Sequence, residues 1–183
     1  MERKKLLGLA AVILVAAVVI GASGIYDLGG PNSQEFNRND VMFMNMMIVH
    51  YEQAIEMAEL SENKTENENI LELSQNISKA QTRENEQMKA WMNELGMSYG
   101  NHHRMAGMAT REQMQQLRNS NGSEFNELFA QLMIEHHEGG IAMAQNFRDA
   151  GQHEELMEMQ KGMIDAQQRE IELMRRWQDQ GLL

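Results

Sequence analysis

The sequence repeats itself at an offset of 86 residues, and this repeat constrains the fold more than any other feature. The segment MIVHYEQAIEMA (47–58) aligns with MIEHHEGGIAMA (133–144), and AQTRENEQMKAW (80–91) aligns with AQQREIELMRRW (166–177). From Phe43 to Trp91 the two copies share seventeen identities in forty-nine positions without a gap, where about three are expected by chance. We therefore interpret most of the chain as two copies of one structural unit.

Each copy carries two helical patterns separated by helix-ending residues. The chain has one Pro in 183 residues and 5% aromatic residues, which favours helices over strands. Capping boxes begin at Thr65 and Thr110, and Gly96 and Gly151 mark helix ends. The pattern predicts long helices at about 39–62, 66–95, 123–149 and 153–179, with a short helix after Thr110. Two such hairpins, each with one apolar stripe to bury, predict an all-α four-helix bundle.

The N-terminal residues predict a membrane segment. Residues 6–22 form an uncharged apolar run that follows the basic residues Arg3, Lys4 and Lys5. The run is slightly shorter than the ~20 residues that span a bilayer, and it also fits the apolar region of an export signal. We favour an uncleaved membrane anchor over a cleaved signal, and in either case the rest of the chain lies outside the cytoplasm.

The predicted organisation has three parts. A membrane anchor or signal segment occupies 1–28, a polar linker occupies 29–38, and the duplicated domain occupies 39–183. Within the domain, repeat one is 39–96, a Met- and His-rich connector is 97–122, and repeat two is 123–180.

The composition narrows the chemistry. The chain has no Cys, so disulfides, thiolate metal sites and cysteine nucleophiles are excluded. Its net charge of -11 offers no basic surface for a phosphate backbone, so we expect no nucleic-acid partner and expect cations instead. It contains 18 Met and 6 His, which leaves thioether and imidazole as the ligands for a soft metal.

Helical spacing places several of these residues on the faces that should turn inward. The first and third helices carry the stripes Phe43, Met47, His50, Ala54, Met57 and Phe129, Met133, His136, Gly140, Met143. The second and fourth helices carry Ile77, Gln81, Glu84, Met88, Trp91 and Met163, Gln167, Glu170, Met174, Trp177. Each half therefore brings a His, a Glu and several Met into the interior, where an unpartnered polar group costs several kcal/mol.

The spacing of the inward ligands favours copper. Two-metal sites in ferritin-like proteins use Glu-x-x-His, because iron and manganese prefer carboxylate oxygen. This chain has Met47-Ile-Val-His50 and Met133-Ile-Glu-His136, with a thioether in place of the carboxylate. Such a ligand set suits Cu(I) first and Cu(II) second. Glu84 and Glu170 keep a two-metal redox enzyme as an alternative.

Each of these residues also has a purely structural interpretation. Met47, Met57, Met133 and Met143 can be core packing, since Met fills irregular gaps. His50 and His136 can be core histidines hydrogen-bonded to Glu84 and Glu170. His137 is a further candidate ligand, although its stripe can instead face a groove.

The connector holds a second candidate metal site. His102, His103, Met105 and Met108 fall in a stretch with the character of an exposed loop. Burial would not explain methionines there, so soft-metal capture is one interpretation. The other is that Met105 and Met108 fold down as a lid over the bundle.

The second half resembles a known family. The segments MAGMATREQMQQL, LMIEHHEGGIAMAQ and MIDAQQREIELMRRW resemble the domain of unknown function 305 family, and the resemblance covers about residues 39–180. It implies a ferritin-like four-helix bundle, and some members are exported copper-binding proteins. The family usually has His-His in both copies, whereas the first copy here has His50-Tyr51, so a symmetric four-histidine site is in doubt.

Together these features predict an extracytoplasmic copper-binding protein that serves sequestration, tolerance or transfer. No nucleophile with a paired base, phosphate loop or dinucleotide fingerprint indicates an enzyme. The expected partners are a copper ion, the membrane through the N-terminal segment, and a second copy of the chain or a copper donor or acceptor protein. The alternative from a different class is a metal-free helical interaction module.

Overall fold

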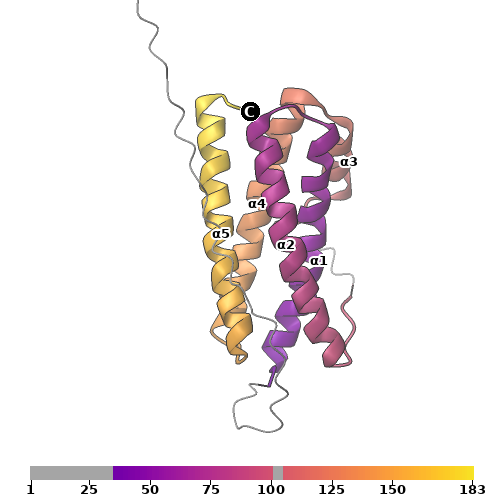
Figure 1. The fold of residues 1–183 in the computed structure, drawn as a ribbon, viewed down its shortest axis with the longest axis vertical. Helices are drawn as coiled ribbons and strands as arrows, with labels where there is room; N and C mark the ends of the chain where they lie inside the picture. The colour runs from indigo at the N-terminus through magenta and orange to yellow at the C-terminus, as the bar shows by residue number, and fades with distance from the viewer. Residues whose placement is uncertain (1–34, 101–104) are drawn as a thin grey trace, which may run out of the picture. The chain divides into compact units, whose positions relative to one another are not determined.

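The computed structural model describes residues 35–100 and 105–183, and within these ranges the fold is helical throughout, without a strand. The long helices are α1 (Arg38–Leu60), α2 (Glu68–Glu94), α4 (Gly122–Arg148) and α5 (Glu154–Gln180) (Figure 1). The short elements are the 3-10 helix η1 (Ser61–Asn63) and the helix α3 (Arg111–Asn119). The all-helical prediction is confirmed, and each predicted long helix begins and ends within two residues of the observed one.

The predicted membrane segment, 1–28, lies outside the described residues. Among the helices that are described, none has both the length and the apolar character that crossing a bilayer requires. The connector histidines His102 and His103 also lie outside the described residues.

The helix starts follow from local capping, with one correction to the prediction. Thr110 caps α3 as expected, because its side chain accepts from the Gln113 N–H while the Gln113 side chain accepts from the Thr110 N–H. The capping box predicted at Thr65 is wrong. Asn67 is the N-cap of α2, and the Thr65 hydroxyl accepts instead from the Asn67 N–H. Both Thr65 and Asn67 are suitable N-cap residues, and Asn caps a helix at least as well as Thr.

Two helical hairpins make up the domain. α1 packs chiefly against α2 and α4 against α5, while contacts between α1 and α4 join the hairpins and α3 touches both of these helices. In Figure 1 the four long helices run side by side, with α3 next to α1. The core is divided into two apolar clusters. The first includes Met57, Ile77, Phe125, Phe129, Met133 and Met174. The second includes Phe43, Met47, Met88, Met92, Met143 and Met163.

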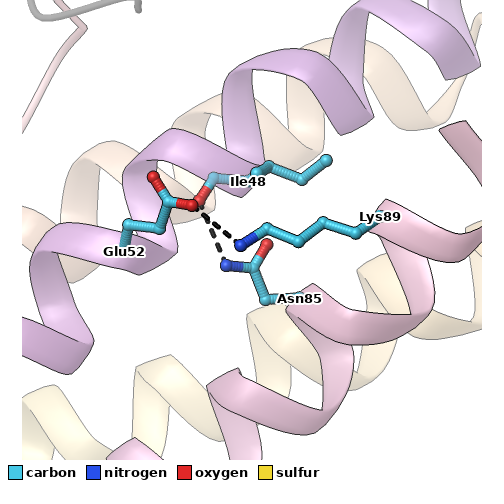
Figure 2. A network of polar contacts seen from close by, with 4 residues as sticks. All are labelled: Ile48, Glu52, Asn85 and Lys89. Atoms are coloured by element: carbon cyan, nitrogen blue, oxygen red, sulfur yellow. Dashed lines mark hydrogen bonds and ion pairs between the residues drawn. The ribbon is translucent and has the colours of Figure 1, made fainter. Parts of the chain in front are cut away.

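Polar contacts fix the register of α1 against α2. The Asn85 side chain donates to the Ile48 carbonyl at 3.3 Å, and Lys89 pairs with Glu52 at 2.8 Å (Figure 2). The buried bond of Asn85 contributes more than the exposed ion pair, because solvent screens exposed pairs to below about 1 kcal/mol. In the other hairpin, Arg175 pairs with Glu138 at the positions 86 residues further along.

Asp40 braces the start of α1 against the turn between α4 and α5. Its carboxylate is buried and accepts from the backbone N–H of Asn37 at 2.9 Å and from those of Gln152 and His153 at 3.2 Å. The turn passes so close that a Cβ on Gly151 would lie 2.7 Å from an Asp40 oxygen. We call this set of contacts the Asp40 brace.

Candidate metal site

A layer of polar side chains separates the two apolar clusters. On every long helix the polar residues lie, in sequence, where one cluster gives way to the other, and Tyr51 also belongs to the cluster that contains Met47. We call it the polar layer and define it by His50, Tyr51, Gln81, Glu84, His136, His137, Gln167 and Glu170. Six of these side chains are buried, and the two glutamates are half-buried. A polar layer inside a core is costly unless its groups find partners, so their partners define what the layer can do.

His50 and His136 meet at the interface of α1 and α4. Both residues have no exposed surface, and their ring centroids lie 3.7 Å apart with an angle of 37° between the planes. Among the described residues, none forms a hydrogen bond with any of the four ring nitrogens. The sequence prediction that these two histidines lie on inward faces is therefore confirmed. Their predicted bonds to Glu84 and Glu170 are not present.

Burial keeps this histidine pair neutral. Burial first, and then the nearby His137, lower the pKa of His50 to about 4, while the Ala106 backbone acts in the opposite direction. The pKa of His136 is lowered well below its usual value by burial first, and then by His50 and His137. Neutral imidazole has a free lone pair, which is the form that binds metal.

The glutamates bind the neighbouring residues instead. The Tyr51 hydroxyl donates to Glu84 at 2.8 Å, and the His137 Nε2 lies 2.7 Å from a Glu170 oxygen. Each pairing joins residues 33 positions apart. His137 is fully buried, so the interpretation that it faces a groove is wrong.

Burial also shapes the Tyr51 and Glu84 pair. Burial raises the pKa of Glu84, and the nearby Glu170 raises it further. The Tyr51 hydrogen bond and Arg83 act in the opposite direction. Burial also raises the pKa of the Tyr51 hydroxyl well above its usual value, as do the charges of Glu84 and Glu170. Tyr51 is therefore a neutral hydrogen-bond donor, and it differs from an imidazole ligand in this respect.

Gly140 makes room for His50 within the layer. A Cβ at this position would lie 2.7 Å from the Gln167 Oε1 and 3.3 Å from the His50 Cε1. The equivalent position in the first copy is Ala54. Gln167 is buried, and its Nε2 has no hydrogen-bond partner among the described residues. The layer thus offers unpaired donor and acceptor atoms next to the histidine pair.

The predicted methionine ligands divide between the two sides of the layer. Met47 and Met143 belong to one apolar cluster, and Met57 and Met133 belong to the other. All four are buried. Their burial is explained by core packing. It also places a pair of thioethers on each side of the polar layer.

The described part of the connector lies against the helices. Met105 and Met108 are half-buried, and Met105 packs on the cluster that contains Met47. The Gln53 side chain forms two hydrogen bonds with the Ala109 backbone, at 2.7 and 3.0 Å. The lid interpretation of Met105 and Met108 agrees with this placement, whereas an exposed loop at these two residues does not.

The described residues include no group of three His, Asp or Glu side chains that could hold a metal ion. Sequence reasoning missed Tyr51 and Gln53 as parts of this region. Tyr51 could have been found from the sequence, because it is equivalent to the candidate ligand His137 in the 86-residue repeat. No motif marks Gln53.

The family model described as domain of unknown function (DUF305) matches residues 40–178. No curated protein matches the sequence. Among solved structures, a DUF305 fragment from Deinococcus radiodurans has a TM-score of 0.71 and 26% identity, over 76% of this chain and 95% of that one. A candidate secreted DUF305 protein from Streptomyces coelicolor has a TM-score of 0.70 and 28% identity, over 74% of this chain and 88% of that one.

The protein CopM is a further structural neighbour. Its Cu(I)-bound form has a TM-score of 0.67 and 28% identity, over 77% of this chain and 96% of that one. CopM structures in Cu(II)-bound, Ag-bound and apo forms match similarly.

Proposed function

The chain belongs to the DUF305 family, and on that basis we propose that it is an extracytoplasmic copper-binding protein. Its role would be sequestration, tolerance or transfer of copper, on a ferritin-like four-helix bundle. The copper-bound and silver-bound forms of CopM support this proposal, because they are structures of a neighbour with the same helical fold. Copper is here the cargo of the protein.

The observation that carries the proposal is the His50 and His136 pair. Its ring nitrogens are buried and have no partner among the described residues. Leaving a buried polar group unpaired costs about 1–3 kcal/mol, so a core with two such rings needs a compensating ligand. A metal ion bound by the lone pairs would supply it, and the low pKa of His50, about 4, keeps those lone pairs free in mildly acidic surroundings.

The surrounding atoms favour a soft ion. The chain has no Cys, so thioether is its soft donor and imidazole is a borderline donor, and together they suit Cu(I), with Cu(II) second. Glu84 and Glu170 are held by Tyr51 and His137. This argues against their serving as bridging ligands in a two-metal redox enzyme, which needs free carboxylates.

We assign the residues different roles. His50 and His136 are the primary ligands, and Met47, Met143, Met57 and Met133 are the thioethers available on either side of them. Glu170 orients His137 by accepting from its Nε2, which leaves the buried, unpartnered Nδ1 as the ligand atom of that ring. His102, His103, Met105 and Met108 form the proposed second site in the connector.

A copper titration of the full-length chain tests the function. Cu(I), Cu(II), Zn(II) and Fe(II) are added in competition with chelators of known affinity, to the wild type and to His50→Ala, His136→Ala and a His102→Ala/His103→Ala variant. We expect tight Cu(I) binding that both core variants lose. Loss only in the connector variant would move the site to the connector, and absence of copper binding would favour the metal-free interaction module. Tight Fe(II) binding with oxygen consumption would favour the redox enzyme.

A further inference from the structure

We infer that residues 105–109, which we call the strap, form a gate over the histidine pair and that Gln53 is its latch. This inference rests on the proposed copper site and assigns its regulation: the strap must lift for the ion to enter or leave. It predicts that the strap controls the rates of copper exchange and has little effect on the equilibrium affinity.

The latch is a pair of hydrogen bonds from one side chain. The Gln53 amide accepts from the Ala109 N–H at 2.7 Å and donates to the Ala109 carbonyl at 3.0 Å. Gln53 lies on α1, less than one helical turn from His50. A single side chain therefore fixes the end of the strap to the helix that carries one of the two histidines.

The seat of the strap is a close approach of two backbones. Gly107 has φ +80°, and a Cβ there would lie 2.5 Å from the Glu135 carbonyl oxygen and 3.0 Å from that of His136. A Cβ on Gly139 would lie 2.1 Å from the Ala106 carbonyl oxygen. Glycine at both positions is what lets the strap lie directly on the turn of α4 that carries the other histidine.

The remaining contacts place the strap at the level of the polar layer. The Ala106 carbonyl lies against Gly139, three residues from His136 on α4. Met105 packs on the apolar cluster next to the layer, and Met108 is half-buried. The strap thus crosses the interface of α1 and α4 where the two rings meet, and it carries two thioethers that an ion would encounter on its way in.

The holding contacts are few enough for the strap to open. No residue of the strap is helical, and two of its attachments depend on the one Gln53 side chain. Ala109 is buried in one apolar cluster and Met105 packs on the other, and a short segment held by two such side chains opens at a fraction of the global unfolding cost. Removing both hydrogen bonds should raise the open population about tenfold to thirtyfold, at about fivefold for each bond.

The gate can be tested without metal by chemical modification of His50. Diethyl pyrocarbonate reacts with accessible neutral histidine, and a tryptic peptide of residues 39–64 contains His50 as its single histidine. In the full-length chain at pH 7 we expect Gln53→Ala to raise the His50 modification rate about tenfold. Gln53→Glu, which keeps the acceptor for the Ala109 N–H, should give an intermediate rate. His153, in the tryptic peptide 149–161, is the internal reference.

Two further variants make the result specific. Gln115→Ala removes an exposed amide on α3 that, among the described residues, bonds to Asn119 alone, so it should leave the His50 rate unchanged. Gly139→Ala blocks the seat itself and should raise the rate at least as much as Gln53→Ala. Unchanged His50 modification in both Gln53→Ala and Gly139→Ala, with the fold retained by circular dichroism, would overturn the gate.

A copper arm then links the gate to the site. Transfer of Cu(I) between the chain and bicinchoninate, followed by stopped flow, should be about tenfold faster in both directions for Gln53→Ala. The equilibrium affinity should change less than twofold. Weaker binding at an unchanged uptake rate would show that Gln53 supports the ligands, and the gate would be wrong. If the wild type binds no Cu(I), the proposed function fails, while the modification of His50 still decides the gate.

Discussion

Tyr51 and His137 occupy equivalent positions 86 residues apart, and each holds the equivalent glutamate of its own hairpin. The distances are 2.8 Å from the Tyr51 hydroxyl to Glu84 and 2.7 Å from the His137 Nε2 to Glu170. A phenol thus replaces an imidazole while the anchoring of the carboxylate is retained. Only His137 has a second ring nitrogen, Nδ1, which is buried and has no hydrogen-bond partner among the described residues.

Removing the Tyr51 hydroxyl should destabilise the fold. In Tyr51→Phe the half-buried Glu84 carboxylate loses its donor, so we expect the free energy of unfolding to fall by about 1–3 kcal/mol. Tyr51→His should recover most of this loss, because an imidazole can donate to Glu84 as His137 does to Glu170. Urea denaturation measures the effect, and Tyr99→Phe, at an exposed tyrosine, is the matched control. Equal stability of Tyr51→Phe and Tyr99→Phe would contradict the importance of the bond.

Replacing His50 by Leu should separate a copper ligand from a structural histidine. The buried His50 nitrogens have no partner among the described residues. An apolar residue of similar size should therefore leave the copper-free protein equally stable, or more stable by about 1–2 kcal/mol.

The same His50→Leu variant should lose the stabilisation by copper. Cu(I) at a hundred times its dissociation constant should stabilise the wild type by about 2.7 kcal/mol, and thermal melts with and without Cu(I) measure this. A copper-free variant that unfolds far more easily than the wild type, combined with no copper effect in either protein, would point to the interaction module.

Gly140 and Gly162 should respond in opposite directions to the same substitution. In Gly140→Ala the new methyl group meets Gln167 at 2.7 Å and His50 at 3.3 Å, so overpacking should cost about 1–3 kcal/mol and weaken copper binding. In Gly162→Ala the Cβ meets nothing within 4 Å, and the higher helix propensity of Ala should stabilise α5 by about 0.5–1 kcal/mol. Thermal denaturation of both variants is the measurement. A stabilised Gly140→Ala would show that Gln167 and His50 can move to accept the added methyl group.

The copper-free protein should lose stability as the pH falls from 6.5 to 4. Burial lowers the pKa of His50 from 6.5 to about 4, so in this window the unfolded chain binds a proton that the folded chain does not. The contribution is complete above pH 6.5 and is worth about 3 kcal/mol when fully lost. The lowered pKa of His136 acts in the same direction.

The raised pKa of Glu84 acts in the opposite direction, since its contribution is present below pH 4.5 and is lost as the pH rises. The informative quantity is therefore the difference in unfolding free energy between the wild type and His50→Leu, measured by urea denaturation in chelator at each pH. As the pH falls, the wild type should become less stable relative to His50→Leu. A difference that does not change with pH would mean that His50 is accessible to protons in the folded state.

The sequence predicted the helices and their buried faces well because both depend on local information. Periodicity placed Met47, His50 and Ala54 on one inward face, and all three are buried. The partners of the glutamates were predicted one residue away from the observed ones. Adjacent helical residues point about 100° apart, and periodicity alone does not determine which of two neighbours meets a side chain on another helix.

The placement of the connector could not be predicted for a different reason. It depends on Gly107 meeting Gly139 and on Gln53 meeting Ala109, contacts between residues far apart in the chain. None of these residues belongs to a ligand motif. Met105 and Met108 could therefore be interpreted either as exposed metal ligands or as a lid over the bundle. Only the tertiary structure distinguishes the two, and composition and spacing do not determine it.

The Asp40 brace gives the domain a mechanical property. Tension along the chain from its N-terminal side enters at the start of α1, where Asp40 is bonded to the amides of Gln152 and His153. These bonds join the start of α1 directly to the turn between α4 and α5. His50 lies ten residues, about 15 Å along the helix, beyond this point. The Asp40 brace thus ties the first turn of α1 to the other hairpin at a distance from the histidine pair.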